Sequence, residues 1–308
     1  MVAVRLKAWQ LPVLTLVFVI TALAGLRYWR SQTLSPASLQ NYLPAQVSTL
    51  YHVDVSSLAK AGVLSRMVGP PGRQDSDYVR FVEESGFDYQ RDLRSLLVGV
   101  GGDTTYVLAK GVFDWRALRT YAESRNGVCR FSICRMAAYG RNRAISWGPL
   151  GEDTIALAFG PDPWGAATLT NGPRRGGEPI RESAPIWIKS SGSALRSAAN
   201  LPDGMRMFAR ILEPAQQILV SIVPGAHADF DIRLAAECAT PELAGQVASG
   251  LTESTVTLNS LLARENRRPN PADLSSVLAG GSFRAQSKRV TGSWPLSRAF
   301  VDTVLASQ

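Results

Sequence analysis

Apolar positions along residues 86–121 change from a strand-like to a helix-like pattern. Two apolar, β-branched runs, 96–100 and 105–109, flank the tetrapeptide Gly101-Gly102-Asp103-Thr104. Because glycine accepts the positive φ that a tight turn needs, this arrangement predicts a β-hairpin. Phe113 and Asp114 then open a segment whose apolar side chains fall on one face of a helix. The stretch indicates a fold, but it does not name a chemistry.

The same order of predicted elements occurs in both halves of the chain. Each half begins with a strand, at 47–55 or 185–190, and continues with helices, a hairpin, a further helix and a returning strand. This order is typical of an α+β fold of the split β-α-β kind. We therefore expect two tandem similar units of antiparallel sheet, each with its helices packed on one face. The expected boundaries are 45–170 for the first unit, 171–178 for a Gly- and Arg-rich linker, and 179–308 for the second unit.

The N-terminus carries the clearest signal for cellular localisation. Residues 8–26 are almost wholly apolar, close to the roughly 20 residues that span a bilayer. Two interpretations remain open: a signal anchor within residues 1–30, or a signal peptide cleaved after Ala24. We expect the anchor, so that the lipid bilayer is contacted through residues 8–26. Residues 31–44 would then form a polar tether, and the bulk of the chain would lie on the periplasmic side of the cytoplasmic membrane after a single pass.

Composition and charge narrow the class of protein. Hydrophobic residues make up 45% and charged residues 19% of the 308 positions, which is typical of a globular protein and not of a disordered one. The net charge is +8, but Arg5, Lys7, Arg27 and Arg30 beside the apolar segment supply half of it. The remaining excess is too small to predict a nucleic-acid partner.

Several short motifs along the chain resemble those of a family of membrane-anchored, exported bacterial proteins of the Acidobacteria type, which carry a domain of unknown function. They are the apolar N-terminus, Leu43-Pro44, Gly86-Phe87-Asp88-Tyr89 with Arg91-Asp92-Leu93, Lys110-Gly111-Val112-Phe113-Asp114, Ile155-Ala156-Leu157-Ala158 and Glu237-Cys238. The resemblance implies an anchored, exported protein, and it carries over no catalytic residue. Cys129 and Cys134 depart from the pattern, because only a strand is expected there.

Cys129 and Cys134 form a possible disulfide. If residues 129–138 were one extended strand, the two Cα atoms would lie roughly 16 Å apart, whereas a disulfide needs about 7 Å or less. A bond would therefore require a turn at Phe131 and Ser132. Export permits a disulfide, and two buried free thiols are the alternative. The spacing matches no zinc site.

No catalytic residue, cofactor site or metal site is expected. Only His52 and His227 could serve a hydrolytic triad, and no Gly-x-Ser-x-Gly motif is present. Ser57 and Lys60 match Ser-x-x-Lys, but the companion motifs of exported acylases are missing. We therefore expect a non-catalytic protein with a binding or envelope-structural role and a possible envelope protein partner. The alternatives are an exported serine hydrolase or acylase using Ser57 and Lys60, or an accessory subunit of a membrane complex.

Overall fold

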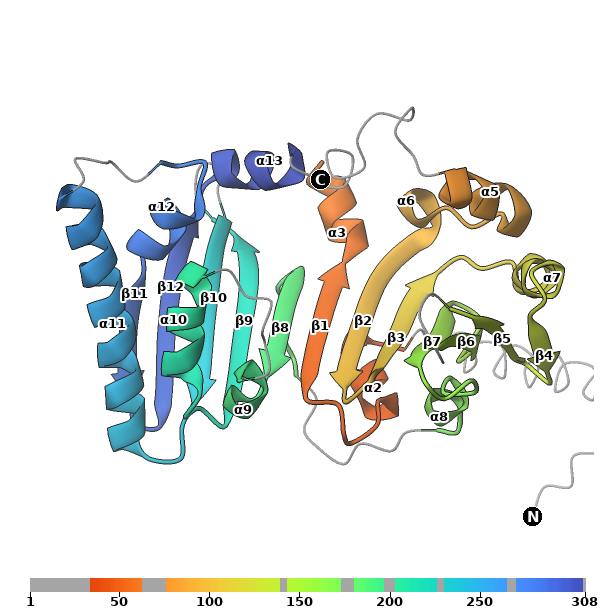
Figure 1. Cartoon of the computed structure of the whole chain (residues 1–308), viewed down its shortest axis with the longest axis horizontal. Coiled ribbons are helices and arrows are strands. Elements are labelled where there is room, and N and C mark those ends of the chain that lie inside the picture. Colours follow the sequence, from red (N-terminus) through yellow and green to blue (C-terminus); the bar gives the residue numbers. More distant parts are fainter. Residues whose placement is uncertain are drawn as a thin grey trace, which may run out of the picture.

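One antiparallel sheet runs through the whole described part of the chain (Figure 1). The computed structural model describes residues 34–62, 76–138, 143–172, 180–196, 203–225, 230–264 and 270–306. Twelve strands lie in the order β11-β12-β10-β9-β8-β1-β2-β3-β7-β6-β5-β4. The α+β class with a large antiparallel sheet is thereby confirmed.

The N-terminal half contributes the strands from β1 to β7. Its strands are β1 (Thr49–Asp54), β2 (Leu93–Gly101), β3 (Thr104–Gly111), β4 (Val128–Arg130), β5 (Ile133–Ala137), β6 (Ala144–Pro149) and β7 (Thr154–Gly160). Its helices are α2 (Pro36–Leu39), the 3-10 helix η1 (Gln40–Tyr42), α3 (Val55–Lys60), α5 (Ser76–Ser85), α6 (Tyr89–Asp92), α7 (Trp115–Ser124) and α8 (Ala167–Thr170). The predicted β2–β3 hairpin is present, and Gly102 in its turn has a φ of +57°.

The C-terminal half contributes the strands from β8 to β12. Its strands are β8 (Ile186–Ser190), β9 (Gln217–Pro224), β10 (Phe230–Glu237), β11 (Ser282–Gln286) and β12 (Arg289–Leu296). Its helices are α9 (Gly192–Leu195), α10 (Asp203–Leu212), α11 (Pro241–Arg264), α12 (Leu274–Ala279) and α13 (Arg298–Ala306). The strands β8-β9-β10-β12-β11 neighbour one another in this order, as β1-β2-β3-β7-β6 do in the other half.

The two halves meet at the antiparallel pair β1–β8, which we call the seam. Tyr51 lies opposite Ile188, and His52 lies opposite Trp187. The His52 and Trp187 rings stack with their centroids 5.1 Å apart, and Trp187 is almost fully buried. The strand ladder therefore continues across the seam, so that neither β1 nor β8 is an edge strand.

The sheet has two faces, which are covered differently. The front face carries Tyr51, Val98 and Val107, and it is covered by α5 and α7 in one half and by α10, α11 and α12 in the other (Figure 1). The back face carries Leu97, Leu108 and Trp187, and in the N-terminal half it packs against α2, η1 and α8. Among the described residues, no helix packs on the back face of β9, β10, β12 and β11. The expectation of helices on one face holds for the C-terminal half only.

The expected tether at 31–44 is wrong from Leu34 onward. Ser35 caps α2, and Leu39 and Leu43 are 1% and 0% exposed in the core of the N-terminal half. Spaced four residues apart, these two leucines share one side of the short helical segment and cover the back face. Lys110 Nζ donates to the Leu34 carbonyl at 2.8 Å, so the described chain is already bound to the fold at Leu34.

Two local predictions are also corrected. The sequence favours Ser56 and Ser57 as the N-cap of the helix after β1, but Asp54 caps α3, because its side chain accepts from the Ser57 amide. The sequence also predicts that the returning strand of the C-terminal half runs over 283–290, whereas the structure has the hairpin of β11 and β12, which turns at Ser287 with a φ of 52°. α12 was not expected, because six residues are too few to show a helical period.

The predicted membrane segment, residues 8–26, lies outside the described residues, as do most of the expected linker and His227. No helix in the described ranges combines the length and the apolar character that crossing a bilayer requires.

His52 gives the seam a pH dependence. Both of its ring nitrogens are buried without a hydrogen-bond partner among the described residues, and burial lowers its pKa below the ordinary 6.5 despite the nearby Asp54 carboxylate. A lowered folded-state pKa means that the unfolded chain binds the proton more readily. We therefore expect the contribution of His52 to the free energy of unfolding to be constant above about pH 6.5 and to fall as the pH drops below it.

Denaturant titrations across this pH range test the expectation, with His52→Phe as the comparison. Phenylalanine keeps a ring against Trp187 and cannot take up a proton, so part of the acid dependence should disappear. An identical acid slope in the variant would show that His52 does not sense pH.

Candidate functional site

An apolar cavity of about 460 Å³ lies between the front face of the N-terminal half and the helices α5 and α7. It is within the size range of small-molecule sites, roughly 300–1,000 Å³. Every lining residue is apolar or aromatic: Phe81, Phe87, Leu93, Leu96, Val107, Ala109, Phe113, Leu118, Tyr121, Met136, Ile145, Trp147, Ile155 and Leu157. The site therefore offers contact area and shape, and no charged group.

The floor of the cavity follows from the alternation of side chains along the strands. Val107 and Ala109 on β3 point to the front face, while Leu108 between them points to the back-face core. Leu157 lies opposite Val107 in the β3–β7 ladder, and Trp147 lies opposite Leu157 in the β6–β7 ladder. Neighbouring strands thus present one continuous apolar surface.

The α7 wall is fixed by its N-terminal cap. The Asp114 carboxylate accepts from the backbone amides of Arg116 and Ala117, at 3.0 and 2.9 Å. The cap sets the helix phase so that Leu118 and Tyr121 turn toward the sheet, as the amphipathic pattern predicts.

Polar contacts at both ends hold α5 over the cavity. Near its start, the Tyr78 hydroxyl donates to Asp88 at 2.9 Å; burial, and then this bond, raise the pKa of Tyr78. Near its end, Arg125 on the α7 side donates to Glu84 at 3.1 Å. Between these points, Phe81 meets the Tyr121 ring edge-on with centroids 5.0 Å apart. Aromatic contacts and these two polar contacts together hold α5 in place.

The C-terminal half has a filled core where the N-terminal half has the cavity. There α11 has 24 residues, against 10 in α7. Val247 and Leu251 of α11, with Phe208 and Leu212 of α10, pack directly onto the strands. The shorter α7 brings fewer apolar side chains to the sheet, which leaves room beneath it.

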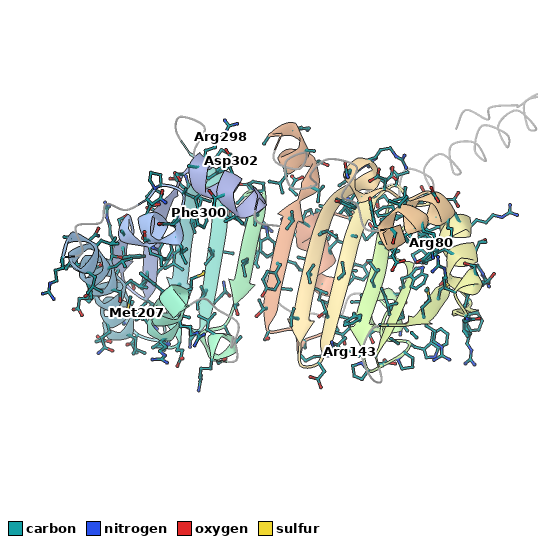
Figure 2. The ribbon with its side chains drawn as sticks, turned by 45° about the horizontal axis from the view of Figure 1, so that its top comes forward. Arg80, Arg143, Met207, Arg298, Phe300 and Asp302 are labelled. Atoms are coloured by element: carbon teal, nitrogen blue, oxygen red, sulfur yellow. A yellow bond between two sulfur atoms is a disulfide. The ribbon has the colours of Figure 1, made fainter. Side chains whose placement is uncertain are left out.

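The apolar surface continues from the cavity onto the central strands. Val107 pairs with Val98, Val98 with Tyr51 and Tyr51 with Ile188, so one row of side chains crosses the front face toward the seam. Tyr51 is 40% exposed. Figure 2 shows these central strands without a helix across them, between α5 with Arg80 on one side and α10 with Met207 on the other.

Cys129 and Cys134 are joined by a disulfide across the β4–β5 hairpin, with their Cα atoms 4.0 Å apart. The single extended segment expected at 129–138 is wrong, because the chain turns at Phe131, which has a φ of 52°, and at Ser132. The turn places the two cysteines directly opposite each other. Their hairpin forms the outer edge of the sheet beside the cavity strands.

Among the described residues considered for catalysis, no hydrogen bond joins a nucleophile to a base. The Ser57 hydroxyl donates to Asp54 at 2.8 Å within the α3 cap, and no hydrogen bond joins Ser57 to Lys60 in the described structure. His52 stacks on Trp187 at the seam. Within the described residues, no group of three or more His, Cys, Asp or Glu side chains is placed to hold a metal ion.

Sequence reasoning did not find the cavity. The aromatic residues Phe81, Phe87, Phe113 and Tyr121 lie within a short span and give a signal of a shared apolar cluster. The pattern cannot distinguish a filled cluster from a hollow one, because that depends on how far α5 and α7 stand from the sheet.

No protein-family model matches this chain, and no curated protein sequence matches it. Among solved structures it is similar to two crystal forms of TP0453, each with a TM-score of 0.49 and 9% identity. Form I is matched over 90% of this chain and 99% of TP0453, and form III over 87% and 97%. A likeness at this level bears neither on the family nor on the function of the chain.

Proposed function

We propose that this chain is a membrane-tethered, extracytoplasmic binding protein without catalytic activity, and that its ligand is an apolar molecule held in the cavity beneath α5 and α7. The observation that carries the proposal is the cavity of about 460 Å³ with a wholly apolar lining.

An unfilled cavity of this size is costly. At roughly 24 cal/mol per Å³, an enclosed void of about 460 Å³ would cost on the order of 10 kcal/mol, comparable with the whole stability of a domain. The cavity is partly open, which reduces this cost but leaves apolar side chains wetted. An apolar ligand would remove that surface from water at about 25 cal/mol per Å².

The shape of the apolar surface favours an elongated ligand. The row from Val107 through Val98 to Tyr51 extends the cavity floor toward the seam. A chain-like molecule could lie in the cavity with one end and along this row with the other. The lining provides no charge to neutralise, so the buried part of the ligand should be a hydrocarbon.

The geometry favours binding over hydrolysis. A nucleophilic serine needs a base within hydrogen-bond reach, and the described partner of Ser57 is the capping carboxylate of Asp54. The hydrolase alternative using Ser57 and Lys60 has no further support in the described contacts. Covalent labelling of Ser57 by a fluorophosphonate, lost in Ser57→Ala, would restore it. The accessory-subunit alternative is compatible with ligand binding.

The proposed membrane location depends on residues 8–26 and on their short distance along the chain from Leu34. The carbonyl of Leu34 is bonded to Lys110, so at most about 29 Å of extended chain separates it from Leu26. If residues 8–26 form an anchor, the folded part is held close to the bilayer. The disulfide between Cys129 and Cys134 suits an exported protein.

We also propose that the two halves are tandem similar units. The matching neighbour orders β1-β2-β3-β7-β6 and β8-β9-β10-β12-β11 support this, as do the front-face positions of α5 with α7 and of α10 with α11. If so, the C-terminal unit has a filled core, and the N-terminal unit has a cavity in the equivalent place.

Ligand binding can be tested with a fatty acid that carries a photoreactive diazirine at its chain end. We expect the full chain, reconstituted in nanodiscs, to be cross-linked in the peptides that hold Phe81, Leu118 and Leu157. Ala109→Phe fills the cavity and should lower this cross-linking about tenfold, since loss of the buried contact costs at least 1.4 kcal/mol. The control Ala285→Phe, on the exposed edge strand β11, should leave it unchanged. Cross-links confined to residues 8–26, or equal in Ala109→Phe, would contradict the proposal.

Export is tested with alkaline phosphatase fused after Gln308. The enzyme folds only outside the cytoplasm, because it needs disulfides, so we expect an active fusion in the membrane fraction. Activity in the soluble fraction alone would indicate cleavage after Ala24. An inactive fusion would end the export proposal.

A further inference from the structure

The back face of the C-terminal half forms an open hollow of about 410 Å³ over β9, β10, β12 and β11. The equivalent face of the N-terminal half is apolar and covered by α2, η1 and α8. Here most of the outward positions are polar instead: Ser221, Arg233, Ser282, Arg284, Arg289, Thr291 and Ser293. We propose that this hollow is a binding site for an anionic group, a phosphate or a carboxylate, separate from the apolar cavity.

The strand register places three arginines around Thr291 on the back face. Arg284 lies directly opposite Thr291 in the β11–β12 ladder, where Cβ atoms are about 4.5–5.5 Å apart. Arg289 precedes Thr291 by two residues on the same strand and face. Arg233 pairs with Ser293 and is the diagonal neighbour of Thr291, at about 7–8 Å. Three guanidinium groups on three adjacent strands can therefore reach one point above Thr291.

Of these three arginines, only Arg289 has an ion-pair partner among the described residues. Arg289 pairs with Glu237, with Nε and Oε1 3.3 Å apart. Within the described residues, Arg233 and Arg284 form no ion pair, and both are exposed. Arg233 and Arg284 lie on the two strands that flank β12 and carry the same charge. An anion above Thr291 would be attracted by both charges and accept charge-assisted hydrogen bonds from both groups.

Two further acids are described in or beside the hollow. Glu182 lines it and accepts from the backbone amides of Ser183 and Ala184, at 2.9 and 3.0 Å, through one carboxylate oxygen. Asp231 lies two residues before Arg233 on the same face of β10, on the side away from Arg284. Hydroxyl groups surround the centre, with Ser282 and Ser293 joined at 3.1 Å. The hollow thus combines arginine and hydroxyl donors with a few small or apolar positions, such as Ala235 opposite Thr291.

Phenylglyoxal, which modifies accessible guanidinium groups, tests the site in the full chain, with peptide mass spectrometry as the readout. We expect inorganic phosphate to slow modification of Arg233 and Arg284 several-fold. Arg94 and Arg116, which are exposed in the other half, serve as internal controls and should react at an unchanged rate. Equal protection at all four positions, or none at Arg233 and Arg284, would overturn the proposal.

Nanodiscs separate the two sources of such a group. If the anion is a lipid headgroup, discs with anionic lipid should protect Arg233 and Arg284 without added phosphate, while zwitterionic discs should not. If it is a soluble anion, only added phosphate should protect them in either disc.

A variant that carries its own anion gives an independent test. Thr291→Glu places a carboxylate at the centre of the three arginines, so it should slow modification of Arg233 and Arg284 and abolish the effect of phosphate. Thr291→Gln has nearly the same shape without the charge and should behave like the parent protein. Indistinguishable behaviour of the two variants would show that the arginines do not converge on this point.

Discussion

The pairing of β1 with β8 is the interaction on which the rest of the fold depends. Each of these strands would otherwise be a sheet edge with unpaired amides and carbonyls, which invites association with other chains. Their antiparallel ladder, the buried Trp187 and its stack with His52 make two sheets into one of twelve strands. The ladder also keeps the front face of one half on the same side as the front face of the other.

Once the sheet is continuous, the lengths of the covering helices decide what each region can do. α11, with 24 residues, seals the front face of the C-terminal half, whereas α7, with 10, leaves the apolar cavity. On the back face the situation reverses, because α2, η1 and α8 cover the N-terminal half and the arginine-bearing strands of the other half are open. Two proposed sites of opposite chemistry thus arise on opposite faces of one sheet.

The sequence predicts the α+β class, the β2–β3 hairpin and the helix start at Asp114, because these depend on local chemistry and periodicity. It does not predict the turn at Phe131 or the hairpin at Ser287, since both place a non-glycine residue at positive φ. It also misses the role of Leu39 and Leu43, which cover a face built from strands far along the chain. The cavity is missed for the same reason, as helix-to-sheet distance is a tertiary property. The arginines around Thr291 become neighbours only through the strand register.

Cutting the chain between the halves tests the shared sheet most directly. A protease site inserted within residues 173–179 of the full-length protein allows cleavage after folding, followed by gel filtration without denaturant. A seam formed by the β1–β8 ladder predicts that the two fragments elute together at the position of the uncut protein and part only on unfolding. Two fragments that elute separately, each with native secondary structure by circular dichroism, would contradict a single shared sheet.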